Sequence, residues 1–210
     1  MTLPNNREFK LKIKWYLSSY RVCGDCRYAI SGLREERPAF SSWRVQWAGI
    51  CALLKTSIHL LGKKDARACL PPVLRQSLKD AWVELGRRRS EFPLFWEFID
   101  KERNNILKEY DISAYPAIIR SDGTVDQTSY SLLYMLGEAE EEALILRGGP
   151  YDGQFALDVA ADATDWAEGY ILQAIRNAGF DPEEEVRSSD FLNEALRDMG
   201  LLSARTGSAS

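Results

Sequence analysis

The sequence predicts a mainly α-helical protein, a helical bundle of about five long helices with a small β-hairpin insertion between the last two long helices. The first observation is that apolar residues recur at steps of three and four along separate stretches, the spacing of one face of an α-helix. The second is that short β-prone runs around an Asp-Gly turn interrupt this pattern near residues 116–149. The 210 residues are 45% hydrophobic, which is enough for one core. We expect a single domain over 1–182, then an acidic connection, a short helix and a disordered tail over 183–210.

The N-terminal segment "REFKLKIKWYL" alternates apolar and polar residues, which predicts a β-strand or an extended arm. Helix boundaries follow from residues that favour helix ends. Ser41 is a suitable N-cap before the second helix, and Pro71-Pro72 suits the first turn of the third. The long helices are expected at about 19–36, 41–62, 71–85, 90–110 and 155–178, and a short last helix at 190–199.

The β insertion is expected from two segments between the last two long helices. "YPAIIRSDGTVDQ" places an Asp122-Gly123 turn between β-prone runs, which predicts a hairpin. "EALILRGGPYDG" predicts another short strand that ends in a glycine-proline loop.

Charge is unevenly distributed along the chain, although the net charge is only -4. Residues 1–54 carry nine Lys/Arg and four Asp/Glu, whereas residues 137–200 carry four against sixteen. An anionic ligand would prefer the basic first half, especially near "GRRRS", which contains Arg87 and Arg88. The alternative interpretation is that the basic and acidic halves attract each other within the fold.

The sequence shows no sign of export or membrane insertion. No apolar run approaches the length of a membrane span, and the N-terminus has no apolar signal-peptide core. Four cysteines without a secretion signal do not predict a disulfide scaffold. We therefore expect a cytoplasmic protein without membrane association, and no motif indicates a cofactor.

The thiols of "CGDC", Cys23 and Cys26, are the first chemical candidates. Their Cys-x-x-Cys spacing and the later "AYPAII", which looks like the cis-proline segment of thioredoxin-like folds, imply a thiol–disulfide oxidoreductase. Both cysteines also fall on one apolar helical stripe, which predicts core thiols instead. Zinc would need Cys51, His59 or Cys69 as further ligands, and no second close pair exists, so no metal site is expected.

The helix containing "FWEFIDKERNNILKEY" is the second candidate, because Arg103 completes an apolar series between Ile99 and Ile106. A buried guanidinium must be paired or must face a cleft, since burying it unpaired costs several kcal/mol. One interpretation is a buried ion pair with a carboxylate of the acidic second half. The other is a functional arginine that shares one face of the helix with Tyr110.

The segment "RNNILKEY" resembles the signature of HEPN domains, small helical bundles found in nucleotide-binding and RNA-cleaving proteins. Their motif is Arg, a polar residue, a few more and then His. One branch, the toxin of a toxin–antitoxin pair, adds a Tyr two residues after the His. Arg103, Asn104 and Tyr110 match, and Lys108 stands where the family has its histidine. Lysine, with a pKa of about 10.4, is a cation and a poor general base, so ribonuclease activity is the doubtful part of this resemblance.

The resemblance covers roughly residues 19–112 and implies a homodimer that binds RNA or a nucleotide, with a toxin or defence role. It implies catalytic roles for Arg103, Lys108 and Tyr110, with Asn104 as a ligand-binding residue; the basic residues Arg87 and Arg88 are further ligand-binding candidates. The wider chain, with its "GPYDG" segment, also resembles a widespread group of uncharacterised bacterial proteins, which implies no activity. The alternative to the HEPN-like function is a non-catalytic module that binds a partner protein.

Overall fold

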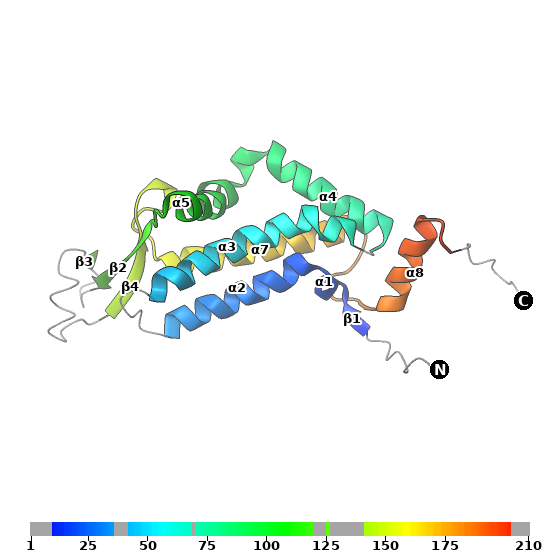
Figure 1. The fold of residues 1–210 in the computed structure, drawn as a ribbon, viewed down its shortest axis with the longest axis horizontal. Helices are drawn as coiled ribbons and strands as arrows, with labels where there is room; N and C mark the ends of the chain where they lie inside the picture. Colours follow the sequence, from blue (N-terminus) through cyan, green and yellow to red (C-terminus); the bar gives the residue numbers. More distant parts are fainter. Residues whose placement is uncertain (1–9, 36–41, 69, 120–124, 127–140, 203–210) are drawn as a thin grey trace, which may run out of the picture. The chain divides into compact units, whose positions relative to one another are not determined.

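The chain is mainly α-helical and carries small antiparallel sheets, as the sequence predicts (Figure 1). The computed structural model describes residues 10–35, 42–68, 70–119, 125–126 and 141–202. The chain divides into two compact units. Unit 1 comprises residues 1–22, 56–88 and 167–210, and unit 2 comprises residues 23–55 and 89–166.

The long helices lie close to their predicted positions. α2 (Ser18–Glu35), α3 (Ser42–Lys63) and α7 (Ala156–Asn177) each continue from one unit into the other. α4 (Pro72–Arg87) belongs to unit 1, and the fourth predicted helix consists of η3 (Leu94–Asp100) and α5 (Lys101–Glu109) in unit 2. This helix begins later than predicted because a 3-10 turn, η2 (Arg89–Glu91), precedes it. The shorter helical elements are α1 (Ile13–Tyr16), η1 (Asp65–Arg67), η4 (Gly149–Tyr151) and α8 (Ser188–Asp198).

The N-terminal strand of unit 1 is shorter than the alternating pattern predicts. β1 (Lys10–Lys12) pairs antiparallel with β5 (Glu185–Arg187), and the chain then turns into α1. The prediction of a strand through Leu17 is therefore wrong. Ile13 and Leu17 are both buried, and their spacing of four suits a helical turn as well as a strand. β5 lies within the segment expected to be only an acidic connection, where glutamates hide the strand pattern.

The β insertion of unit 2 is confirmed and is larger than a hairpin. β2 (Ala114–Ile119) is the centre of a three-stranded antiparallel sheet, with β3 (Val125–Asp126) on one side and β4 (Glu141–Leu146) on the other. The expected turn at Asp122-Gly123 lies outside the described residues. The pairing of β2 with β4, which sets Ala114 opposite Leu146, was not predicted.

Unit 1 is held together by close contacts between its elements. The Asp65 carboxylate, 1% exposed, accepts hydrogen bonds from the backbone N–H groups of Ser18 and Ser19 at 2.9 Å each, which caps the start of α2. Gly62 of α3 lies directly against Trp82 of α4. These contacts fix the starting point of α2 and the spacing between α3 and α4.

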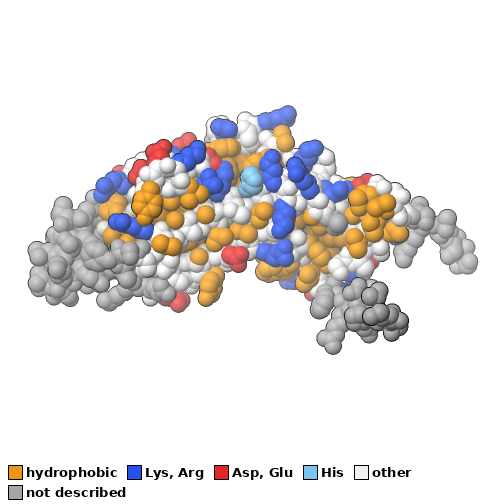
Figure 2. All heavy atoms as spheres, viewed as in Figure 1, with side chains coloured by type: hydrophobic (Ala, Val, Ile, Leu, Met, Phe, Trp, Pro, Cys, Tyr) orange, Lys and Arg blue, Asp and Glu red, His pale blue; other side chains and the backbone are white. Residues whose placement is uncertain are grey.

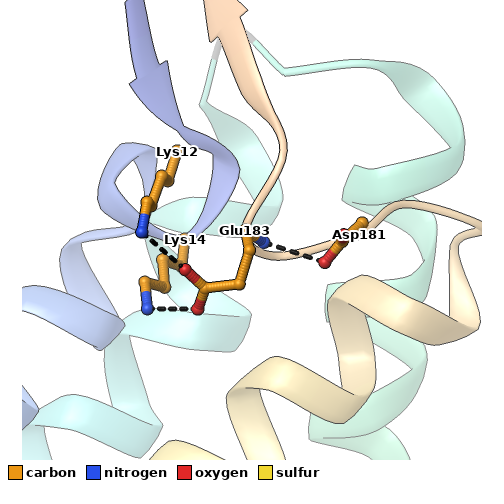
Figure 3. Close-up of polar contacts among 4 residues, drawn as sticks. All are labelled: Lys12, Lys14, Asp181 and Glu183. Atoms are coloured by element: carbon orange, nitrogen blue, oxygen red, sulfur yellow. Dashed lines mark hydrogen bonds and ion pairs between the residues drawn. The ribbon is translucent and has the colours of Figure 1, made fainter.

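Ion pairs join the basic first half of the sequence to the acidic second half, as the charge pattern allows. In unit 1, Glu183 accepts hydrogen bonds from both Lys12 and Lys14 (Figure 3). In unit 2, Arg27 and Arg34 of α2 pair with Asp165 and Asp158 of α7 at 2.7 and 2.6 Å; all four residues are well exposed. Exposed pairs of this kind contribute about 0–1 kcal/mol each. Much positive charge remains at the surface, and Figure 2 shows Lys and Arg side chains spread widely over the face that it draws.

Among the helices over the described residues, none combines the length and the apolar character that crossing a lipid bilayer requires.

Candidate functional site

The candidate site is a pocket of about 360 Å³ that lies entirely within unit 2. We call it the Glu102 pocket. One side consists of residues of η3 and α5, a second of the segment that enters β2, and a third of the loop that leaves β4. The lining residues are Glu97, Phe98, Lys101, Glu102, Asn105, Asp111, Ile112, Ser113, Tyr115 and Leu146–Tyr151.

Irregular backbone surrounds the pocket on each of these sides. η3 is a π-helix, a wide helical turn. Such turns are rare in proteins as a whole, and those that occur are often at functional sites. α5 is followed by Tyr110, which has a left-handed conformation with φ 54° and is the only non-glycine residue with positive φ among the described residues. Gly148 and Gly149, with φ 76° and 71°, turn the chain after β4 in a conformation that glycine adopts without strain. The pocket therefore lies where three elements depart from regular geometry.

Glu102 is the most unusual residue of the pocket, because it is a carboxylate that is only 4% exposed. Its Oε1 accepts hydrogen bonds from the indole Nε1–H of Trp47 at 2.9 Å and from the backbone N–H of Ser113 at 3.2 Å. Both donors use the same oxygen, and Oε2 has no hydrogen-bond partner among the described residues. The carboxylate is therefore held in one orientation, while the accepting capacity of Oε2 is unused among the described residues.

The surroundings of Glu102 are apolar and closely packed. Trp47 is fully buried and its ring lies 6.2 Å from that of Phe98, centroid to centroid. Burial raises the pKa of the Cys51 thiol well above its usual value, and the negative charge of Glu102 adds to this shift. Cys51 thus stays a neutral thiol beside the carboxylate and adds no second negative charge there.

The rim of the pocket carries charges of both signs. Glu97 and Asp111 supply carboxylates, and Lys101 and Arg147 supply cations; all four are exposed. The guanidinium of Arg147 lies 4.6 Å from the centroid of the Tyr115 ring, which is a cation–π contact. The rim charges balance in number, so the buried carboxylate of Glu102 gives the pocket its net negative character.

Tyr151 closes the pocket on the side of the β4 loop. Its ring packs edge-to-face against Phe98, with 5.6 Å between the centroids. Burial raises the pKa of the Tyr151 hydroxyl, and Glu97 raises it further, so the phenol remains a neutral hydrogen-bond donor at neutral pH.

Arg103 does not line the pocket. It is half-buried and its guanidinium donates a hydrogen bond to Oδ1 of Asn104 at 2.9 Å. Asn104 donates in turn to Asp100 at 3.2 Å, and the other carboxylate oxygen of Asp100 pairs with Lys55. Among the described residues Arg103 has no ion pair with a carboxylate, so the predicted buried pair with the acidic second half is absent there.

The structure does not bring the other predicted site residues to Arg103. Lys108 is exposed on α5, and Tyr110, 75% exposed, lies one residue beyond the end of the helix. No hydrogen bond or ring contact joins either residue to Arg103 within the described part of the chain. Arg87 and Arg88 lie at the end of α4 in unit 1, where Arg88 pairs with Glu84.

The cysteines have the environment of core residues. Cys23 and Cys26 are 1% and 0% exposed and lie inside α2, which begins at Ser18, so they do not open the helix as a redox pair would. Burial raises the pKa of Cys26 to about 12. Cys69, the further zinc candidate, lies outside the described residues. Over the described ranges, no group of three or more His, Cys, Asp or Glu side chains is placed to hold a metal ion.

The sequence pattern did not identify Glu102, because the apolar series that begins at Phe92 puts Arg103 on the apolar face. Phe95, 0% exposed, is the first deeply buried residue of this helix, whereas Phe92 precedes it. Counted from Phe95, Glu102 falls at the centre of the buried face and Arg103 lies about 100° further round. If Phe95 and Ile106 alone define the apolar face of the helix, Glu102 lies on that face and is identified as a buried carboxylate.

No protein-family model matches the chain, and neither a curated protein nor a solved structure matches it. The chemistry of the pocket itself is therefore the basis for a functional proposal.

Proposed function

We propose that this protein binds a small polar molecule in the Glu102 pocket. The observation that carries the proposal is the buried carboxylate of Glu102, which lines the pocket, is held through Oε1 by Trp47 and Ser113, and has no partner for Oε2 among the described residues. A buried polar group without a partner costs free energy, and a bound molecule that donates a hydrogen bond removes this cost.

The size and lining of the pocket support the same proposal. A volume of about 360 Å³ is at the lower end of the range of about 300–1,000 Å³ that is usual for small-molecule sites. Aromatic walls from Phe98, Tyr115 and Tyr151 surround a few polar groups, which is the usual composition of such sites. The proposed function is recognition of a ligand, and it includes no catalytic step.

The test is a fragment screen on the full-length protein, followed by backbone amide NMR shifts and thermal unfolding. Fragments that bind are expected to shift amides of Glu102, Ser113 and Arg147. Asn105→Trp places a large side chain at the pocket wall and should abolish binding. Leu107→Trp is the matched control, because Leu107 lies on the same helix, is 55% exposed and does not line the pocket. Fragments that bind both variants equally, or that shift amides elsewhere, would contradict the proposal.

RNA or nucleotide binding of the HEPN-like kind is a second candidate, favoured by one observation. The half-buried Arg103 is positioned by Asn104, and no carboxylate of the described residues neutralises it. A positioned guanidinium can bind a phosphate through two parallel hydrogen bonds.

The test of this candidate is an RNA gel-shift assay at low and high salt, with Arg103→Ala and Arg103→Lys compared with Lys101→Ala. Loss of binding in both Arg103 variants, with little change in the Lys101 variant, would support it. Equal RNA binding by all four proteins, or none by the wild type, would exclude it, and a growth assay on expression checks the toxin role.

A further inference from the structure

We propose that the Glu102 pocket selects an organic cation, a molecule that presents a primary ammonium, an amidinium or a guanidinium group on a small apolar or aromatic body. This inference rests on the proposed function, ligand binding in the same pocket, and specifies the chemical class of the ligand.

The buried carboxylate lacks a positive partner of its own. An ionised carboxylate in an apolar environment is stable only when it is paired and hydrogen-bonded. Trp47 and Ser113 supply two neutral donors to Oε1, and the described residues supply no ion pair to Glu102. A ligand cation that donates to Oε2 would complete the site with a charge-assisted hydrogen bond, which is about twice as strong as a neutral one.

The cations of the rim do not fill this position. The guanidinium of Arg147 lies on the Tyr115 ring, 4.6 Å from its centroid, and Lys101 is exposed at the rim. Neither residue forms an ion pair with Glu102 among the described residues. A metal ion is a poor alternative occupant, because Glu102 belongs to no group of three metal-ligating side chains in the described part of the chain.

The walls of the pocket also favour an organic cation. Phe98 and Tyr151, with ring centroids 5.6 Å apart, give an aromatic surface beside the carboxylate. Aromatic faces attract cations through the negative face of the ring, and they stack well on a flat ligand body. Glu97 and Asp111 offset the two cations of the rim, so the rim does not repel a positive ligand on its way to the carboxylate.

The experiment uses three matched probes on the full-length protein at neutral pH: benzamidine, which is cationic, benzamide, which is neutral and of nearly the same shape, and benzoate, which is anionic. Calorimetry and amide NMR shifts measure affinity and location. Benzamidine is expected to bind at the Glu102 pocket about tenfold more tightly than benzamide, and benzoate should not bind there.

Two variants, each lacking one carboxylate, test whether Glu102 causes the preference for benzamidine. Glu102→Gln keeps an oxygen for the Trp47 indole but removes the charge, and it should erase the preference for benzamidine. Glu109→Gln removes an exposed carboxylate from the same helix outside the pocket and should leave that preference unchanged. The comparison of the three probes on the wild type stands even if Glu102→Gln does not fold.

The outcomes separate the two proposals. Benzamide or benzoate binding in the pocket as tightly as benzamidine would overturn the cation inference and leave ligand binding intact. Benzamidine selectivity that survives in Glu102→Gln would also overturn it. Should none of the probes and no screened fragment shift the pocket amides, both the inference and the proposed function would fail.

Discussion

Gly62→Ala tests the close approach of α3 and α4 in unit 1. A Cβ atom on Gly62 would lie 2.3 Å from Cγ, 2.6 Å from Cβ and 2.7 Å from Cδ2 of Trp82. Ordinary van der Waals contact between carbon atoms begins at about 3.5 Å, so the tightest of these distances falls short by roughly 1 Å. Because one of the clashing atoms is the Cβ of Trp82, a rotation of the indole cannot relieve the contact, and α4 has to move.

The magnitude follows from two opposing effects. Overpacking of a closely packed contact costs about 1–3 kcal/mol, and this contact is severe enough for the upper end of that range. Replacing glycine by alanine inside a helix stabilises by about 1 kcal/mol. We therefore expect Gly62→Ala to lower the free energy of unfolding by about 2 kcal/mol, or the melting temperature by about 4–8 °C for a chain of this size.

The matched control is Gly49→Ala in the same helix, where an added Cβ meets no atom within 4 Å. This variant has only the gain in helix propensity and should be more stable than the wild type by about 1 kcal/mol. Urea unfolding followed by circular dichroism measures both variants. A Trp82→Gly background, which has neither the indole nor the Cβ atom, should remove the penalty of Gly62→Ala, as a double-mutant cycle would show. If Gly62→Ala is as stable as Gly49→Ala, the described packing of α3 against Trp82 is wrong.

Three further outcomes are expected from the same reasoning. Asp65→Ala leaves the amides of Ser18 and Ser19 without their acceptor and should cost about 2–3 kcal/mol in urea unfolding, with Asp65→Asn intermediate; a neutral result would refute the capping role. Cys26, buried and with a pKa of about 12, should resist a thiol reagent near neutral pH until the protein is unfolded, and fast labelling of the native protein would contradict this. Tyr170 has a folded-state pKa raised by burial to about 12, so its contribution to stability is present below pH 10.0 and is lost as pH rises toward 12; alkaline unfolding curves of wild type and Tyr170→Phe should therefore differ in slope.

The helices were predictable because their signals are local. Proline at the start of α4 and a stripe from Trp43 to Leu61 in α3 identify these elements from neighbours within a few turns of the chain. The errors occur where a distant segment decides the local structure. β1 is a strand only over the residues that pair with β5, more than 170 residues later, and no periodicity of the N-terminal segment contains that information.

The site was predictable only in part. The sequence directed attention to the correct helix, because a charged residue on its apolar stripe was the anomaly to explain. It selected Arg103 where the buried charge is Glu102, one position earlier, since one residue turns an α-helix by about 100°, enough to move a side chain off the buried face. The partners of Glu102 come from α3 and from the segment before β2, and the loop of Gly148 and Gly149 completes the pocket. Those neighbours depend on tertiary packing, which spacing within one helix cannot reveal.

Glu102 is a carboxylate at a buried position where apolar residues are expected. Its neighbours on the buried face of the helix, Phe95, Ile99 and Ile106, are apolar, and an apolar residue in its place would add to the core without the cost of burying a carboxylate. Two neutral donors on one oxygen reduce this cost without providing a countercharge. A buried charge that lowers stability and lines a pocket, between a π-helical turn and a left-handed residue, is the pattern expected at a binding site. This cost to stability is the reason for proposing that Glu102 serves ligand binding.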